Sequence, residues 1–220
     1  MAALATTISV LGAVALFEPV NGYQVRRELL SWQLDQWAQI KPGSIYSMLA
    51  TLTRQGYVER HDISDDGRPV AVHVTTAAGR THLAQLLDHA LTETDPLSPL
   101  PFHVALMMAG LLPRDRVAGC LSRRLDNLAA LDRGLRSKLD RMASGEHTPP
   151  DVVDVVRLSH DLVLTEIAWV QRRLADVEAG RFTFLGEPAT WAPPPDDPGH
   201  QMTAERALYR RLLALPDSGD

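Results

Sequence analysis

Residues 42–55 bring together the side chains with the clearest chemical potential in the chain. They are expected to form one helix whose two faces differ in chemistry. One face is apolar and suited to a core, with Ile45, Met48, Leu49 and Leu52. The opposite face is polar at spacings of three, four and three, with Ser44, Ser47, Thr51 and Arg54. Small hydroxyls allow a helix to lie deep in the major groove of DNA, and a terminal arginine suits a phosphate or a guanine.

Three further side chains extend this predicted polar face. Tyr46 lies beside it and is expected to reach the sugar-phosphate backbone. Lys41 precedes the helix, whose exposed N–H groups also favour a phosphate. Arg68 lies in a turn and would touch a neighbouring minor groove or a phosphate. Each feature also has a simpler interpretation, because solvated helix faces and exposed hairpin arginines are common in proteins without DNA.

The surrounding segments predict the elements that would hold this face in place. Three helices are expected, over residues 2–17, 23–33 and 42–55. Gly56 supplies a left-handed end to the third helix. The spacing of apolar residues then changes from helical to alternating. This change predicts two strands, over 57–63 and 70–74, joined by a turn at 65–69. Thr75 or Thr76 is expected to cap a fourth helix. This is the element order of a winged helix-turn-helix.

The second half of the chain is predicted to be almost wholly helical. A long apolar seam begins after Pro113, breaks at 145–150 and is followed by a helix to Gly180. That last helix has two apolar edges, and one of them can cover the protomer's own core. The second edge consists of Val155, Leu158, Leu162 and Trp169. It needs another partner, and the same edge of a second copy of the chain would supply one. A monomeric bundle is the alternative.

The expected architecture is therefore mainly α (α+β), in three parts. Residues 1–95 form the winged helix-turn-helix with its connecting helix, and 96–182 a helical dimerisation and effector domain. Residues 183–220 form a proline-rich linker and a C-terminal helix that carries Arg206, Arg210 and Arg211. These arginines are either a solvated face or an added contact.

The charge of the chain gives DNA binding no support. The net charge is −5, and residues 1–76 contain six Lys and Arg against seven Asp and Glu, a net charge of −1. A strongly basic domain is the usual electrostatic signature of a DNA binder. The placement of the charges must therefore carry the case. The main rival interpretation is a winged helix that serves only as a protein-interaction or dimerisation module.

The sequence gives little support to other classes of function. No nucleophile motif, phosphate loop or metal-ligand spacing accompanies the eight histidines, so no enzyme, metal site or cofactor is expected. One cysteine, Cys120, fits a reducing cytoplasmic location, and redox sensing is only a remote alternative. Residues 2–17 are uncharged, but they lack the basic leader of a secretory signal and are too short to span a bilayer. A buried first helix is expected instead.

A small-molecule site is a further candidate where the helical domain meets the winged helix. Adaptable and aromatic side chains suited to a flat apolar ligand occur there: Phe102, Met107, Met108 and Trp169. Their plainer interpretation is core packing, since such residues at helical spacing usually fill a core.

Five short motifs together resemble one family, the PadR family of bacterial transcriptional regulators. In order, they span residues 21–23, 40–46, 52–58, 66–69 and 75–80, and they include Pro-Gly-Ser-Ile-Tyr and Gly-Arg-Pro. The resemblance covers residues 1–80, and residues 100–180 are similar only in length and helicity. It implies a homodimer that binds operator DNA, usually to repress, and releases it when a small molecule or partner binds. It also places four residues near DNA: Tyr23, Ser44, Tyr46 and Arg68.

Two positions depart from that family's pattern. Lys41 stands where Ser, Thr or Asn is common, which removes a helix cap worth roughly 1 kcal/mol. The wing lacks the further basic residues that often follow Gly-Arg-Pro, so Arg68 is nearly alone there. DNA binding is therefore expected to depend only shallowly on salt. The leading hypothesis is a dimeric repressor on an inverted-repeat operator.

Overall fold

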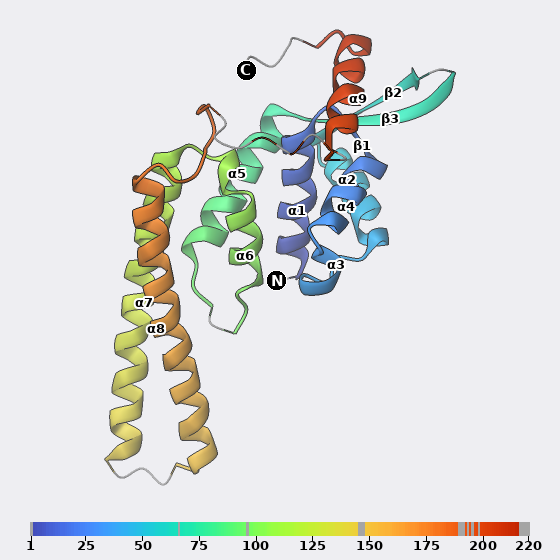
Figure 1. Ribbon diagram of the computed structural model, residues 1–220. Helices are drawn as coiled ribbons and strands as arrows, with labels where there is room; N and C mark the ends of the chain where they lie inside the picture. Colours follow the sequence, from blue (N-terminus) through green and yellow to red (C-terminus); the bar gives the residue numbers. More distant parts are fainter. Residues whose placement is uncertain are drawn as a thin grey trace.

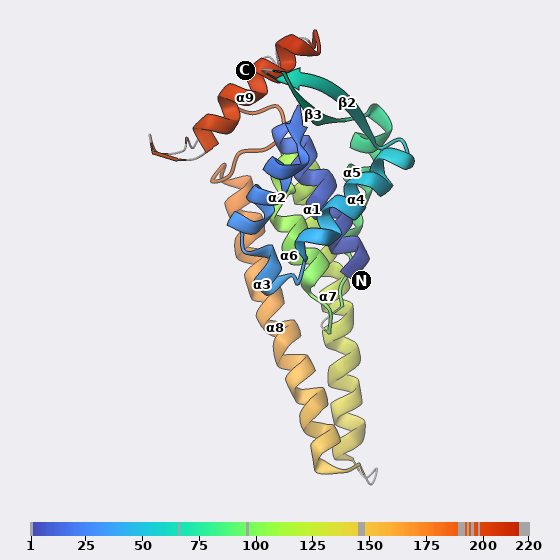
Figure 2. The ribbon, with the colours of Figure 1, turned by 90° about the vertical axis from the view of Figure 1, so that its right-hand side faces the viewer.

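The computed structural model describes residues 2–65, 67–95, 97–144, 148–188 and 199–215, together with 192, 194, 196 and 197. Two bodies are apparent: a globular part around the first helix, and a long two-helix hairpin that projects from it (Figures 1 and 2). The elements of the globular part are α1 (Ala2–Phe17), β1 (Val20–Asn21), α2 (Gly22–Ser31), α3 (Leu34–Trp37), α4 (Pro42–Arg54), β2 (Val58–Asp65), β3 (Arg68–Thr75), α5 (Ala77–Thr92) and α6 (Leu100–Met107). A 3-10 turn (Ala109–Leu111) leads to the hairpin, formed by α7 (Arg114–Ala143) and α8 (Pro150–Glu178), and α9 (Gly199–Leu212) ends the described chain.

Helix α1 is the centre of the globular part. Because the helix contains no charged residue, nearly all of its sides can be buried. Ile8, Leu11 and Val14 are fully buried. Gly12 permits close packing against α6, because a Cβ there would lie 2.8 Å from the sulfur of Met108. The buried first helix expected from the sequence is confirmed. In the described part of the chain, no helix combines the length and hydrophobicity required to cross a membrane.

The sheet has three antiparallel strands in the order β1-β3-β2. Strands β2 and β3 pair from Val58 opposite Thr75 to Asp65 opposite Arg68, which forms the wing. The predicted wing is confirmed, except that Asp66 of its turn lies outside the described residues. Strand β1 was not expected, because two residues are too short to give an alternating pattern. It pairs with β3 through Val20 opposite His73 and Asn21 opposite Val72.

Local capping explains where the helices begin. Asn21 and Gln24 form a reciprocal capping box at the start of α2. Thr76, rather than Thr75, caps α5 by accepting a hydrogen bond from the Gly79 amide at 3.0 Å. Gly79 itself packs against the chain before β2, since a Cβ there would lie 2.0 Å from the Tyr57 carbonyl oxygen. This contact holds α5 against the base of the wing.

Some helix boundaries differ from those expected. The second helix ends at Ser31 instead of continuing to Gln33, whose φ of 58° is left-handed and stops the helix. The short helix α3 follows, and the indole of Trp37 donates a hydrogen bond to the Trp32 carbonyl. The C-terminal helix begins at Gly199, earlier than the expected Met202.

The two apolar edges predicted for α8 have different surroundings. One edge faces α7 and is buried, with Val156, Val163, Val170 and Val177. This confirms that one edge covers the protomer's own core. The other edge is solvent-exposed in the single chain, with Val155 62%, Leu158 60%, Leu162 47% and Trp169 38% exposed. Exposed apolar side chains grouped along one helix edge are unusual on a monomer's surface.

Candidate nucleic-acid interface

Helix α4 presents the predicted polar face to solvent. Ile45, Leu49 and Leu52 are buried against the core, and Met48 is partly buried. On the opposite side Ser44, Ser47 and Arg54 are exposed, and Thr51 is half-buried. Tyr46 is 45% exposed beside them. These exposures confirm the apolar and polar faces that the spacing predicted for this helix.

The hydroxyls of this face are occupied within the free protein. Ser47 donates to the Gly43 carbonyl at 3.0 Å, and Thr51 donates to the Ser47 carbonyl at 2.9 Å. In this arrangement their oxygens remain open as acceptors, which suits the amino groups of adenine or cytosine. Contact with a phosphate, which only accepts, requires each hydroxyl to turn away from the helix backbone first. The guanidinium of Arg54 lies 3.5 Å from the Thr51 hydroxyl at the far end of the face.

The N-terminus of α4 has no side-chain cap, as Lys41 predicted. Lys41 occupies the N-cap position with an extended backbone and makes no side-chain capping bond. Its side chain is exposed beside a shallow hollow that Ser44, Ser47 and Thr51 also line. Uncapped N–H groups next to a cation form a favourable place for an anion.

An open groove of about 840 Å³ runs between α4 and the wing. Tyr23 and Tyr46 line one side, with Tyr23 62% exposed at the start of α2. Arg54 and Arg60 both reach the groove, and Ala71 contributes to its wing side. Arg68 is exposed at the tip of the wing, next to the turn. The structure thus brings predicted residues of α2 and α4 together at the groove, whereas Arg68, which pairs with Asp65, lies at the tip on the other face of the wing.

Arg60 is a candidate residue that the sequence reasoning did not identify. It lies on β2, opposite His73 of β3, on the face of the wing that lines the groove. Its guanidinium is held by Asp62 through bonds of 3.0 and 2.7 Å. The signal available in the sequence was the alternation of Arg60 and Asp62, which places both on one face of a strand.

Replacing Asp62 by asparagine is expected to tighten DNA binding roughly threefold to tenfold, because it frees Arg60 and removes a negative charge beside the DNA path. Stability should hardly change, since side-chain exposures of 54% and 70% make this a weak surface pair. Affinity is measured by fluorescence anisotropy at fixed salt.

Asp154→Asn provides the matched control. Asp154 forms an equally exposed pair with Arg157 on α8, with exposures of 72% and 65%. That substitution should leave DNA affinity unchanged. Unchanged or weaker binding by the Asp62→Asn variant would remove Arg60 from the interface.

His73 lies beneath the same groove. It is 7% exposed, and burial is the main cause that lowers its pKa below 6.5. The Arg60 and His61 charges lower the pKa further, whereas a backbone bond to Val20 and the Asp62 charge raise it. A lowered pKa means that the folded state favours neutral His73, so this histidine costs stability only as the pH falls below 6.5.

The four candidate effector residues do not form one cluster. Phe102 and Trp169 meet edge-to-face with ring centroids 6.0 Å apart. Met108 is buried against α1, whereas Met107 is 43% exposed. A cavity of about 200 Å³ borders Phe102, between the end of α5 and α7.

The sequence raised two other kinds of site, a reactive thiol and a metal site. Cys120 is fully buried, and burial raises the pKa of its thiol, which keeps it protonated and unreactive. Among the described residues, no cluster of three or more His, Cys, Asp or Glu is arranged to hold a metal ion.

Comparisons with known proteins point to one family. No curated protein matches the chain. Among solved structures, Bacillus subtilis PadR in complex with operator DNA is 18% identical, with 78% of this chain and 98% of that chain covered and a TM-score of 0.33. The same protein in complex with p-coumaric acid is 19% identical, with 79% and 96% covered and a TM-score of 0.32. These scores are too low to transfer any residue's role. The model of the "Transcriptional regulator PadR-like family" matches residues 10–85, the segment from α1 into α5, which confirms the resemblance of its motifs to that family.

Proposed function

We propose that this chain is a sequence-specific DNA-binding transcriptional regulator, acting as a dimeric repressor that a small molecule releases. The observation that carries the proposal is the exposed face of α4, with its hydroxyls, Tyr46 and Arg54, next to a wing that carries Arg68. The family match over residues 10–85 supports the regulatory role.

The geometry suggests how such a complex would form. Helix α4 enters the major groove, with Ser44, Ser47 and Thr51 toward base edges or phosphates. The sugar-phosphate backbone follows the groove between α4 and the wing, past Tyr23 and Arg54. Lys41 holds a phosphate at the start of α4, and Arg68 reaches the next minor groove or a phosphate.

Dimerisation would place two such surfaces on one operator. The exposed stripe of Val155, Leu158, Leu162 and Trp169 on α8 is the proposed contact with a second copy. Two recognition helices related by two-fold symmetry would enter major grooves about 34 Å apart, so the operator should be an inverted repeat.

The effector would be a flat aromatic or apolar molecule bound where the helical domain meets the winged helix. The proposed contacts remain Phe102, Met107, Met108 and Trp169. The pair of Phe102 and Trp169 is the best-supported part of this set, because the two rings meet edge to face and Phe102 borders a cavity. The exposed Met107 would have to turn toward it.

Replacing Tyr46 or Arg54 by alanine is expected to weaken binding to DNA from upstream of the chain's own gene roughly tenfold, the loss of one good contact. Both side chains are exposed, so the folded dimer should persist. The measurement is a gel-shift titration at several salt concentrations, with Arg133→Ala, which removes an exposed arginine of α7, as the control.

The same titration separates the proposal from its rival. A winged helix kept only for protein interaction, consistent with a net charge of −1 over residues 1–76, would bind neither this DNA nor its variants specifically. Unchanged affinity in both variants would remove the assignment of the recognition face. The salt slope should be shallow, well below that of a repressor with ten phosphate contacts.

A further inference from the structure

The wing has two faces, and only one of them lines the groove. Residues directly opposite one another in an antiparallel sheet point to the same side. Arg60 with His73, and Asp62 with Ala71, therefore share the groove side. The other side carries an apolar row along the wing, formed by Val72, Val74 and Ile63.

This apolar row is covered. Along β2, His61, Ile63 and Asp65 are half-buried, whereas Arg60, Asp62 and Ser64 between them are exposed. Val72 on β3 is fully buried, yet it lies outside the main core cluster. Something other than the core of the winged helix must therefore shield this side of the wing.

Helix α9 provides the cover. Figure 1 shows α9 next to β1, β2 and β3, and Figure 2 shows it next to the ribbon of β2 and β3. Asn21 pairs with Val72 in the sheet, and the Asn21 amide donates to the Tyr209 hydroxyl of α9 at 3.1 Å. Since cross-strand partners share a side, Val72 faces α9 as well. Met202 and Tyr209, two turns apart on α9, are 6% and 2% exposed.

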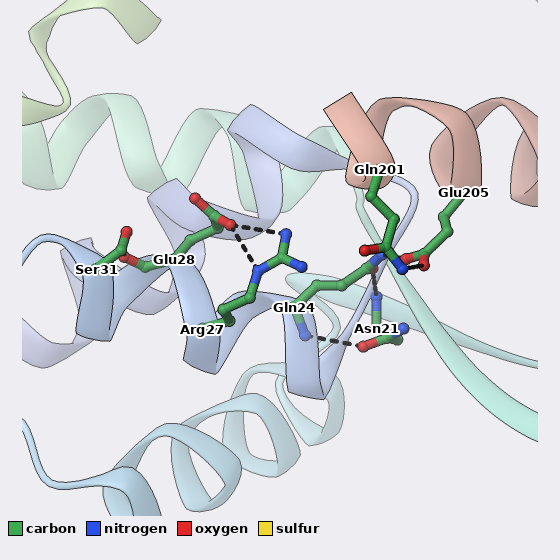
Figure 3. Close-up of polar contacts among 7 residues, drawn as sticks. All are labelled: Asn21, Gln24, Arg27, Glu28, Ser31, Gln201 and Glu205. Atoms are coloured by element: carbon green, nitrogen blue, oxygen red, sulfur yellow. Dashed lines mark hydrogen bonds and ion pairs between the residues drawn. The ribbon is translucent and has the colours of Figure 1, made fainter. Parts of the chain in front are cut away.

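Polar contacts fix α9 to the corner where the wing begins. Arg206 donates to the Glu18 carbonyl at 2.7 Å, and the Gln24 amide donates to the Glu205 carboxylate. Figure 3 shows Gln201 and Glu205 of α9 above the capping box of Asn21 and Gln24. The Tyr209 pKa is raised by burial first and then by the Glu205 and Asp65 carboxylates.

We propose that α9 positions the wing for DNA, as a brace on the side opposite the groove, with Arg206 and Tyr209 as its positioning residues. A two-stranded ribbon alone is only marginally stable in water, so its direction depends on what packs against it. By covering the apolar row, α9 holds the wing so that Arg60, on its other face, stays at the groove. Because α9 and the groove lie on opposite faces of the wing, the brace leaves the DNA path open.

This proposal rests on the proposed DNA-binding function, so its test includes a readout without DNA. The Arg206→Ala/Tyr209→Ala double variant removes both positioning residues from the full chain. Backbone amides of β2 and β3 are expected to exchange with deuterium roughly tenfold faster, as expected for losing one or two hydrogen bonds. Amides of α7, which lies in the hairpin that projects from the globular part, serve as the internal reference.

The DNA readout is affinity together with hydroxyl-radical footprinting. Affinity is expected to fall roughly tenfold, with protection lost where the wing lies and kept where α4 lies. Arg211→Ala is the matched control, because it removes an exposed arginine of the same helix. It should alter neither exchange nor affinity. Tyr209→Phe, which removes only the hydroxyl bonded to Asn21, should change both in the same direction but less, even if the double variant does not fold.

Several results would overturn the brace. Unchanged exchange in β2 and β3 would show that α9 does not hold the wing. Tighter DNA binding by the double variant would show that α9 obstructs the DNA. An equal loss of affinity in Arg211→Ala would show a direct charge contact. If the native chain bound no DNA, the proposed function would fail, while the exchange result would still decide whether α9 supports the wing.

Discussion

Replacing Arg124 by alanine is expected to destabilise the protein by about 3–5 kcal/mol, the cost of removing one partner from a buried ion pair. Arg124 is 1% exposed, and its guanidinium bonds the Glu166 carboxylate of α8 at 2.6 Å. It also donates to the Glu93 carbonyl after α5 and lies 3.6 Å from the centre of the Phe102 ring. Burial lowers the Arg124 pKa, and the Glu166 charge opposes that shift. One side chain thus joins α7 and α8 to the globular part, and its loss leaves Glu166 and a carbonyl unpaired.

Chemical denaturation followed by circular dichroism measures this effect. Arg133→Ala is the control, because Arg133 is exposed on the same helix and its loss should change stability by no more than about 0.5 kcal/mol. A loss below about 1 kcal/mol for Arg124→Ala, the size expected of a surface pair, would show that Arg124 does not join the two parts.

The second large effect concerns the exposed stripe of α8. The Leu158→Asp/Leu162→Asp double variant is expected to be a monomer and to bind the operator at least about a hundredfold more weakly, because each winged helix then binds its half-site alone. The two leucines are 60% and 47% exposed in the single chain, so the substitutions place charges where a second copy would bury them. Sedimentation equilibrium gives the mass, and the gel shift gives the affinity.

Gln171→Asp controls for the added charge. Gln171 is exposed on α8, on the opposite side of the helix from Leu158 and Leu162, and this variant should remain a dimer with native affinity. A double variant that is still dimeric would exclude this stripe as the interface. A native chain that is already monomeric would favour the simple bundle.

Much of the fold and of the candidate site follows from local signals in the sequence. The two faces of α4, the alternation along β3, the cap at Thr76 and the left-handed Gly56 involve residues within a few positions of one another. Such signals reflect periodicity, capping and allowed dihedral angles, which nearby residues set by themselves. They were therefore sufficient to place Ser44, Ser47 and Arg54 on the exposed face.

Other features depend on residues far apart in the chain, and only the tertiary structure decided them. Strand β1 exists because β3 pairs with it, across about fifty residues. Asn21 and Tyr209 are 188 positions apart, and nothing near either one indicates that α9 covers the wing. Nor could net charge show that Arg60 faces the groove already paired with Asp62.

The polar face of α4 was thus determined by the sequence alone, because helical periodicity is a local property. The tertiary structure decided which elements surround that face. It added the groove, Arg60 and the packing of α9 behind the wing, since these depend on long-range contacts that form only when the chain is folded.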